Sequence, residues 1–291
     1  MATRSTDLTG CVAAITGGTR GIGKATAAAF VREGIRVAIG GRDMETAQRV
    51  AKELGHGTIA LPLETSDRAS VKAFLDETER QLGPLDIVVH NAGIMIVGPP
   101  AWDEDDRTTA RQIDVNIYGV INGVKEAVPR LLSRKRGHIV NIASGAGKIG
   151  FARGATYSGS KHFIVGMTES LRSELRGTGV EVTCVTPGIV NTELASGHRP
   201  TRGVRVVEAE DVAKGIVAAL RRPRAEVSVR AELSLTSRAR ALLPYNVFEA
   251  LLRATNAKNV MRGVDPDARA AYETRAQHQA PASNEPPTKT P

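Results

Sequence analysis

The residues of this sequence best suited to chemistry are a tyrosine and a lysine four positions apart, Tyr157 and Lys161. On a helix, such positions share one face, so the phenol and the ammonium group are held side by side. A neighbouring positive charge favours the phenolate, and we therefore expect Lys161 to lower the pKa of Tyr157 from about 10 towards neutrality. A phenol tuned in this way can transfer protons at physiological pH. The spacing is common on solvated helix faces, so the hypothesis depends on the rest of the chain.

Short apolar runs alternate with helical segments along the chain. The predicted strands are 11–16, 35–39, 58–63, 86–90, 138–142, 181–185 and 226–229, and the longer predicted helices are 44–54, 67–82, 103–134 with a bend at Pro129, 155–176 and 208–221. This alternation predicts an α/β fold with a doubly wound parallel sheet and helices on both faces. Ligand sites in such sheets lie at the carboxyl ends of the strands. The first glycine turn, Asn91, Ser144 and Pro187-Gly188 all follow predicted strands, so we expect them to form one cleft.

The glycines Gly17, Gly21 and Gly23 come directly after the first predicted strand and open a helix. Glycines permit a tight turn and let the backbone approach a pyrophosphate, and a helix N-terminus offers it unpaired N–H groups. This pattern predicts a dinucleotide site.

Charge after the second predicted strand indicates which dinucleotide binds. NAD sites usually place an acid there, whereas this chain has Gly41 followed by Arg42, which can pair with a 2′-phosphate. Arg20 in the glycine turn can reach the same phosphate. We therefore expect NADP(H) as the preferred cofactor. NAD(H) stays the alternative, because the Asp43 carboxylate could bind the ribose instead.

Composition argues against several other classes of protein. The 291 residues carry a formal net charge of +8, but the basic residues are scattered and aromatic residues make up only 3%. A nucleic-acid site is therefore not expected. No apolar run approaches a membrane span, and the first five residues show no signal-peptide pattern, so we expect a cytoplasmic protein. The two cysteines and six histidines have no metal-ligand spacing, and neither a metal nor a disulfide is expected.

Six motifs in order resemble those of the short-chain dehydrogenase/reductase family. They lie within residues 8–230 and are Thr16–Gly23, Asn91–Gly93, Asn116, Ser144, Tyr157-x3-Lys161 and Pro187-Gly188. The resemblance implies a Rossmann-like, three-layer αβα domain of about seven strands in the order 3-2-1-4-5-6-7. It also implies an enzyme that acts on CH–OH groups with NAD(P).

The resemblance assigns a role to each catalytic position. Tyr157 would be the general acid or base, Lys161 would hold the nicotinamide ribose and lower the tyrosine pKa, and Ser144 would hydrogen-bond the substrate oxygen. Asn116 would hold a water that relays protons from Lys161. Cofactor contacts are implied for Gly17, Thr19, Arg20, Gly21, Ile22, Gly23, Gly41, Arg42, Glu64, Thr65, Asn91, Ala92, Gly93, Tyr157, Lys161, Pro187, Gly188, Ile189 and Thr192. His90, where the family often has asparagine, is interpreted as a satisfied polar residue.

The substrate is indicated only by apolar segments, namely 94–97, 149–151, Leu194 and the C-terminal Leu/Val/Phe stretch within residues 235–254, for which a helix packed on its own domain or on a partner subunit is favoured over a substrate lid. They favour a lipophilic ketone or secondary alcohol. The alternatives are a reductase of 3-oxoacyl thioesters on an acyl carrier protein and a non-catalytic NADP-binding regulatory protein.

The chain continues beyond the part that resembles the family. We expect residues 231–275 to form a helical extension, with peripheral membrane contact as the less favoured role for it, and residues 276–291 to form a disordered tail. By family analogy, the two long helices imply a homodimer or homotetramer.

Overall fold

The computed structural model describes residues 6–197, 206–229, 239–240, 242–254 and 264–277. Its core is a parallel sheet of seven strands in the order β3-β2-β1-β4-β5-β6-β7, so the predicted fold and strand order are confirmed. The strands are β1 (Val12–Thr16), β2 (Arg36–Gly41), β3 (Ile59–Pro62), β4 (Ile87–His90), β5 (Gly137–Ile142), β6 (Val180–Val185) and β7 (Glu226–Val227).

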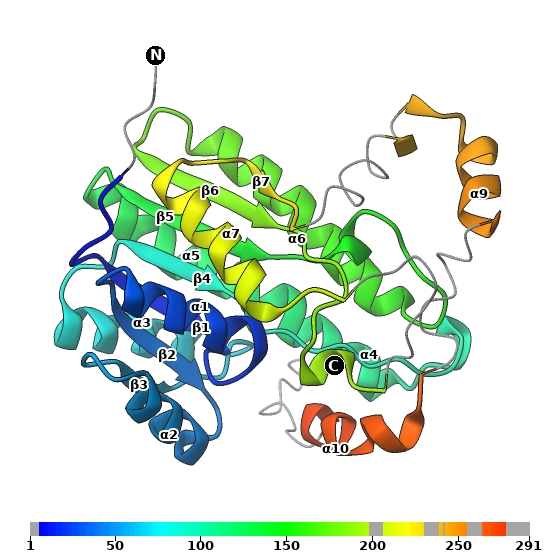
Figure 1. Ribbon diagram of the computed structural model, residues 1–291, viewed down its shortest axis with the longest axis horizontal. Helices are drawn as coiled ribbons and strands as arrows, with labels where there is room; N and C mark the ends of the chain where they lie inside the picture. Colours follow the sequence, from blue (N-terminus) through cyan, green and yellow to red (C-terminus); the bar gives the residue numbers. More distant parts are fainter. Residues whose placement is uncertain (1–5, 198–205, 230–238, 241, 255–263, 278–291) are drawn as a thin grey trace, which may run out of the picture.

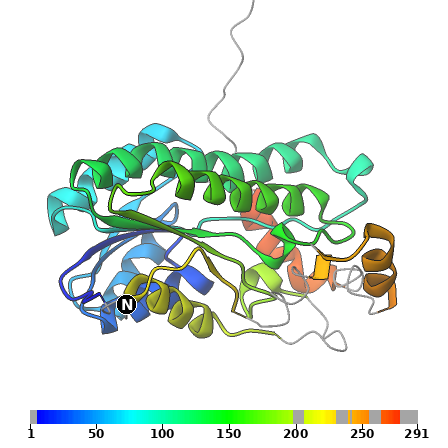
Figure 2. The ribbon, with the colours of Figure 1, turned by 90° about the horizontal axis from the view of Figure 1, so that it is seen from above.

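Helices cover both faces of this sheet and give the three layers seen in Figures 1 and 2. One face carries α1 (Gly21–Arg32), α2 (Met44–Leu54) and α7 (Ala209–Arg221). The other face carries α3 (Arg68–Leu82), α5 (Gly119–Ser133) and α6 (Ala155–Glu174). The central strands are therefore buried on both sides, which explains why they consist of continuous apolar runs.

Strand β1 shows how the sequence supplies both faces of the core. Ala13 and Ile15 pack in the cluster under α1 and α7, whereas Val12 and Ala14 pack in the cluster under α3. All four side chains have no exposed surface. Because side chains alternate along a strand, a strand between two helical layers must be apolar at every position.

Helix starts follow capping chemistry that can be read from the sequence. The Asp67 carboxylate accepts a hydrogen bond from the Ala69 N–H at the start of α3, which is the usual role of an aspartate directly before a helix. Asp43 accepts from the N–H and the hydroxyl of Thr46 at the start of α2. The Asp43 carboxylate therefore serves as a helix cap.

The single long helix predicted over residues 103–134 is wrong in one respect. The structure has a short 3-10 turn, η1 (Ala101–Asp103), then α4 (Asp106–Ile113), then the π-helical segment η2 (Asp114–Tyr118), and then α5. The interruption therefore falls at η2, where the Gly119 N–H bonds to the Asp114 carbonyl five residues earlier, and not at Pro129. Such a bulge adds a residue to the turn and redirects side chains, here that of Asn116.

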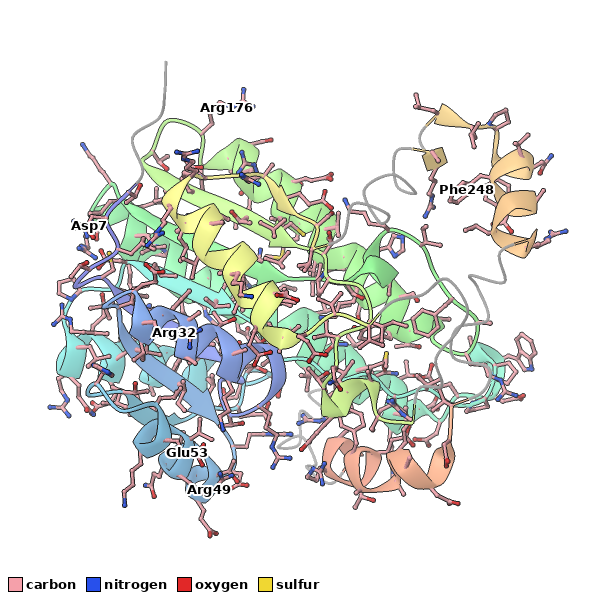
Figure 3. The ribbon with its side chains drawn as sticks, in the orientation of Figure 1. Asp7, Arg32, Arg49, Glu53, Arg176 and Phe248 are labelled. Carbon is pink, nitrogen blue, oxygen red and sulfur yellow. The ribbon has the colours of Figure 1, made fainter. Side chains whose placement is uncertain are left out.

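The described part of the C-terminal extension contains two helices, α9 (Tyr245–Ala254) and α10 (Pro266–Gln277). Figure 1 shows α9 standing out from the αβα body, with Phe248 labelled on it in Figure 3, while α10 lies beside the loops that follow β4 and β6. Residues 276–277, predicted as the start of a disordered tail, belong to α10. Residues 278–291 and parts of the extension lie outside the described residues.

The described helices include none that is long and apolar enough to cross a membrane. Cys11 and Cys184 are both free thiols. Among the residues that the structure describes, no group of three His, Cys, Asp or Glu side chains is arranged to hold a metal ion.

His138 in β5 is a buried titratable group in the core. Burial disfavours its charged form and lowers its pKa to about 4, and the positive charge of Arg172 acts in the same direction. Its Nε2 lies 2.8 Å from Thr183 Oγ1, whose own hydroxyl donates to the Arg224 carbonyl. The Nε2 atom must therefore carry the proton of the neutral ring.

We expect His138 to make folding sensitive to acid. In the unfolded chain the pKa of the His138 ring is near 6.5, whereas in the folded protein it is about 4. Between these two pH values the unfolded state binds a proton and the folded state does not, so acid favours unfolding. Over this window the free energy of unfolding should fall by about 1.4 kcal/mol per pH unit more in the wild type than in His138→Gln. Urea denaturation of both proteins across this pH range measures the difference between their free energies of unfolding. A difference that does not change with pH would contradict the lowered pKa of His138.

Candidate active site

A cavity of about 870 Å³ opens at the carboxyl ends of the strands, as the parallel sheet predicts. Its lining includes every predicted site residue except Gly23 and Asn116, which lie behind it. The residues brought together are Gly17, Thr19, Arg20, Gly21, Ile22, Gly41, Arg42, Glu64, Thr65, Asn91, Ala92, Gly93, Ser144, Tyr157, Lys161, Pro187, Gly188, Ile189 and Thr192. Loops after β1 to β6 therefore converge on one cleft.

The glycine turn after β1 is braced by the loop after β4. The Asn91 side-chain amide donates to the carbonyls of Thr16 and Gly17, at 3.0 and 2.9 Å. Gly17 and Gly21 have φ values of +64° and +49°, a region that disfavours other residues. A Cβ at Gly23 would collide with the Gly17 carbonyl oxygen. This turn therefore requires glycine at these positions.

The residues at the start of α1 fit a dinucleotide phosphate. The helix has no side-chain cap at Arg20 and no acidic residue in its first turn, which leaves backbone N–H groups for an anion at the cavity wall. The Arg20 side chain reaches across the cleft to Glu193, 2.8 Å away in the loop after β6. The positive end of α1 and the open cavity beside it are what a pyrophosphate requires.

A cluster of two arginines and one carboxylate lies beside the end of β2, and its three residues come from different elements. Glu64 Oε2 lies 3.7 Å from Arg42 Nη1 and 3.4 Å from Arg111 Nη2. Arg111 comes from α4, is buried, and lines the cavity. It was not predicted, because a lone arginine in an amphipathic helix is usually solvated. The two guanidinium groups outnumber the one carboxylate of this cluster, and the Asp43 carboxylate, next to Arg42 in the chain, lines the same cavity.

Tyr157 and Lys161 lie side by side on α6, as their spacing predicts. The Lys161 Nζ is 5.7 Å from the centroid of the Tyr157 ring and donates to the Ile142 carbonyl at 3.1 Å. Their side chains are almost fully buried, with 5% and 4% of their surfaces exposed. Both line the cavity, so their polar ends are accessible only from the cleft.

The expected pKa of Tyr157 is wrong in direction. Burial raises it to about 12, and a hydrogen bond with Ser144 opposes the rise only in part. Burial also lowers the pKa of Lys161 to about 8. Desolvation disfavours the charged form of each group, and for these two side chains it outweighs their proximity.

Ser144 and Asn116 are each fixed by backbone groups. Ser144 Oγ accepts from the Ala146 N–H at 3.1 Å, at the start of the short turn η3 (Gly145–Gly147). Asn116 Oδ1 accepts from the Ile94 N–H at 2.8 Å, and its Nδ2 donates to the Ile94 carbonyl at 2.9 Å. The side-chain amide of Asn116 therefore fixes the loop that follows β4 by binding both backbone polar groups of Ile94.

Gly93 marks the point where these groups meet. A Cβ placed there would lie 3.3 Å from Asn116 Oδ1 and 3.4 Å from Lys161 Nζ. The asparagine and the lysine are therefore neighbours across this glycine. The hydroxyls of Ser144 and Tyr157 and the ammonium group of Lys161 therefore line one region of the cleft, and the buried Asn116 amide lies next to it across Gly93.

His90 is only partly as predicted. Its Nδ1 pairs with Asn141 Oδ1 at 2.7 Å, but its Nε2 has no hydrogen-bond partner among the described residues. The ring occupies space left by Gly123, where a Cβ would collide with it. Full burial lowers its pKa, and it does not line the cavity.

The extension contributes four lining residues, of which Leu252 lies in the apolar stretch that the sequence associates with the substrate, whereas the three residues of α10 were not predicted. Leu252 of α9 and Tyr272, Arg275 and Ala276 of α10 all line the cavity. Their types are ordinary for exposed or packed helices, and nothing in their spacing indicates which surface they cover. Their position became visible only with the fold.

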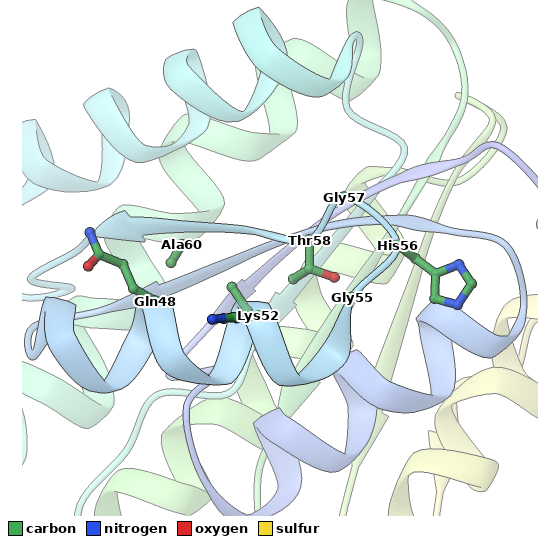
Figure 4. Close-up of a pocket in the computed structure, with 8 residues that line it drawn as sticks. Gln48, Lys52, Gly55, His56, Gly57, Thr58 and Ala60 are labelled. Atoms are coloured by element: carbon green, nitrogen blue, oxygen red, sulfur yellow. The ribbon is translucent and has the colours of Figure 1, made fainter.

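A second cavity of about 400 Å³ lies between α2 and β3 (Figure 4). Its lining consists of Gln48, Ala51, Lys52, Gly55, His56, Gly57, Thr58 and Ala60, and it contains none of the predicted site residues. The chemistry-bearing side chains therefore belong to the cleft at the strand ends.

Comparison with known proteins agrees with the geometry of the cleft. The profile of the family described as short chain dehydrogenase matches residues 11–203, and most of the strands and the whole constellation lie in that range. The chain belongs to the short-chain dehydrogenase family. It is accordingly an oxidoreductase of the class that acts on CH–OH groups with a nicotinamide cofactor.

Relatives in sequence share most of the αβα domain. The chain is 35% identical over 231 residues to glycine betaine reductase ATRR of Emericella nidulans, a match that covers 74% of this chain but 18% of that much longer protein. An uncharacterised oxidoreductase of Staphylococcus aureus is 33% identical over 220 residues, which are 75% of this chain and 94% of the relative.

Relatives in structure carry nicotinamide cofactors. A short-chain dehydrogenase/reductase from Burkholderia phymatum in complex with NAD superposes with a TM-score of 0.75 at 27% identity, covering 81% of this chain and 94% of that one. A 3-ketoacyl-(acyl-carrier-protein) reductase from Brucella melitensis complexed with NADH gives 0.70 at 27% identity, with 76% and 97% covered.

Proposed function

We propose that this chain is an NADP(H)-dependent oxidoreductase that interconverts a lipophilic ketone and the corresponding secondary alcohol. The observation that carries the proposal is the meeting of Tyr157, Ser144 and Lys161 at one wall of the cleft that begins at the glycine turn. A nicotinamide cofactor bound there supplies or accepts the hydride. The side chains of the cleft bind and orient the substrate and the cofactor, and they transfer the proton.

Tyr157 is the proposed proton donor. With a pKa raised to about 12 by burial, its phenol is protonated at neutral pH and can donate to a carbonyl oxygen in the cleft. The Ser144 hydroxyl lies within reach of the Tyr157 hydroxyl and lowers its pKa, so a carbonyl oxygen that enters between the two can replace this interaction and accept from both. This arrangement favours reduction of the ketone.

Lys161 and Asn116 support that transfer. The Lys161 ammonium donates to the Ile142 carbonyl and has further N–H groups for the cofactor ribose and for charge that develops on the Tyr157 oxygen. Asn116 holds the Gly93–Ile94 backbone against the lysine. In the proposed relay, a water beside Asn116 returns protons to Lys161.

The substrate class follows from the other side of the cleft. Met95, Phe151 and Leu194 pack in one cluster with Tyr157, and these residues line the cavity together with Ile149. Apolar walls around two hydroxyl groups suit a molecule with one carbonyl and a hydrocarbon body.

A reductase of 3-oxoacyl thioesters is the second candidate. It is supported by the likeness to the Brucella melitensis 3-ketoacyl-(acyl-carrier-protein) reductase at 27% identity. Turnover of an acetoacetyl thioester in preference to simple ketones would favour it over the first candidate. A non-catalytic regulatory role is the least favoured, because Asn116, Ser144, Tyr157 and Lys161 are all present in one place.

Replacement of Tyr157 by Phe should abolish turnover. The change removes only the hydroxyl, so the buried ring and the fold remain while the proton donor is lost, and kcat should fall by at least about a hundredfold. NADPH oxidation with a panel of lipophilic ketones measures it, and Tyr118→Phe, on the exposed surface, is the matched control. Near-normal turnover of Tyr157→Phe at neutral pH would overturn the mechanism.

The rate of ketone reduction should fall at alkaline pH. The pKa of Lys161 is about 8, so its ammonium is present below pH 8 and lost as the pH rises through that value, whereas Tyr157 stays protonated to about 12. We expect kcat/KM to decrease about tenfold per pH unit above pH 8 and this inflection to disappear in Lys161→Met. A wild-type profile that stays flat from neutrality to pH 10 would contradict the role of the ammonium.

Arg42 should determine the choice of cofactor. Arg42→Ala removes the guanidinium proposed to pair with the 2′-phosphate, so kcat/KM for NADPH should drop by about a hundredfold while that for NADH changes little. Arg49→Ala, an exposed residue of α2 paired with Glu53, is the control. A wild type that prefers NADH would remove this role for Arg42.

A further inference from the structure

Helix α10 lies against the cleft although it belongs to a part of the chain outside the family match, which ends at residue 203. Figure 1 shows it below the loops that follow β4 and β6, and Figure 2 shows it close to the edge of the αβα layers. Three of its residues line the cavity. The extension therefore takes part in shaping the cleft.

Arg269 attaches α10 to two loops that are far apart in the sequence. Its side chain is fully buried, with 1% of the residue exposed. The guanidinium donates to the Met95 carbonyl at 2.6 Å, after β4, and to the carbonyls of Leu194 and Ser196 at 2.9 and 3.2 Å, after β6. Its Nε pairs with Glu273 at 2.8 Å. A buried charge with this many partners is costly to disturb.

Tyr272 holds the same loop from the other side. Its hydroxyl oxygen accepts a hydrogen bond from the Met95 N–H at 2.9 Å, so α10 satisfies both the N–H and the carbonyl of Met95. The Arg269 guanidinium lies 5.0 Å over the Tyr272 ring, a cation–π distance. Ala276, one turn further along, packs with Ile94, and it is 3% exposed. The side of α10 facing the cleft therefore presents the Tyr272 ring and the Ala276 methyl group, with the Arg275 guanidinium at its C-terminal end.

The C-terminal end of α10 is anchored by charge. Arg275 pairs with Glu193 at 2.9 Å, and Glu193 also pairs with Arg20 of the glycine turn at 2.8 Å. At the other end, the Asp265 N–H donates to the Gly197 carbonyl at 2.9 Å. The helix is thus tied at its start, middle and end to the loops that surround the cleft.

We propose that α10 is a fixed wall of the substrate pocket, in which Arg269 is a positioning residue and Tyr272 a residue that determines specificity by limiting substrate length. The proposal rests on the function proposed above. Four of the five N–H groups of Arg269 are already bonded within the protein, and Arg275, which lines the cavity, pairs with Glu193, so this wall offers little to a carboxylate. It suits a compact hydrocarbon body instead. The positive charge of Arg269 also acts to lower the pKa of Tyr157, which supports its closeness to the reactive phenol.

Substitution of Tyr272 tests the length limit. With straight-chain methyl ketones from 2-butanone to 2-decanone, Tyr272→Ala should raise the ratio of kcat/KM for the longest over the shortest by about tenfold, because the removed ring leaves room for additional methylenes. Tyr272→Phe keeps the ring and should keep the wild-type ratio to within about twofold. Tyr245→Ala, on the exposed side of α9, is the matched control. An equal change for all ketones in Tyr272→Ala would overturn the specificity role.

Hydrogen exchange tests the attachment without any substrate. In the full-length protein, Arg269→Met should speed amide exchange in residues 94–97, 193–197 and 266–277 by at least about tenfold, with β1 and β5 unchanged, and Arg269→Lys should restore part of the protection. If these three segments exchange at the wild-type rate in Arg269→Met, the proposal that Arg269 fixes α10 as a wall of the pocket is wrong. A wild type that reduces no ketone would refute the proposed function and the role of Tyr272, whereas the exchange result would still decide whether α10 is a wall.

Discussion

The cleft depends on a seam of hydrogen bonds between the ends of β1 and β4. The Thr16 hydroxyl accepts from the N–H groups of Asn91 and Ala92, at 2.9 and 3.0 Å, and the Asn91 amide returns bonds to the carbonyls of Thr16 and Gly17. Two strands that neighbour each other in space but are separated by three helices and two strands in sequence are thereby locked in register. The seam satisfies backbone groups that would otherwise be buried without partners, and so it fixes the glycine turn relative to the loop that leads to the reactive side chains.

That loop, residues 93–96, is held by side chains from three separate elements. The η2 residue Asn116 binds both polar groups of Ile94, α10 binds both polar groups of Met95, and Gln112 of α4 accepts from the Ile96 N–H at 3.1 Å. A loop outside the sheet has no ladder to satisfy its backbone, so these bonds replace one. Because Lys161 lies against the start of this loop, its position depends on all of them.

The sequence predicts what depends on local pattern and leaves out what depends on distant contacts. The seven strands, the cap at Asp67 and the gathering of the cleft residues follow from periodicity and from parallel topology. The π-helical turn at Asn116 does not, because one extra residue in a helical turn leaves the apolar pattern almost unchanged. Arg269 could not be predicted either, because arginine is rarely fully buried and its partners, apart from Glu273, are backbone carbonyls with no sequence signature.

The pKa of Tyr157 shows why spacing alone cannot settle electrostatics. The spacing places the phenol beside an ammonium group, but the packing that aligns the two groups also removes both from water. Burial therefore shifts the pKa of each group in the direction that disfavours its charged form. A phenol with a pKa near 12 costs about 7 kcal/mol to ionise at pH 7, since each unit corresponds to about 1.4 kcal/mol. The Tyr157 phenol is therefore protonated at neutral pH, and it can act as an acid but not easily as a base. The burial that builds the site thus favours donation of a proton to a carbonyl oxygen.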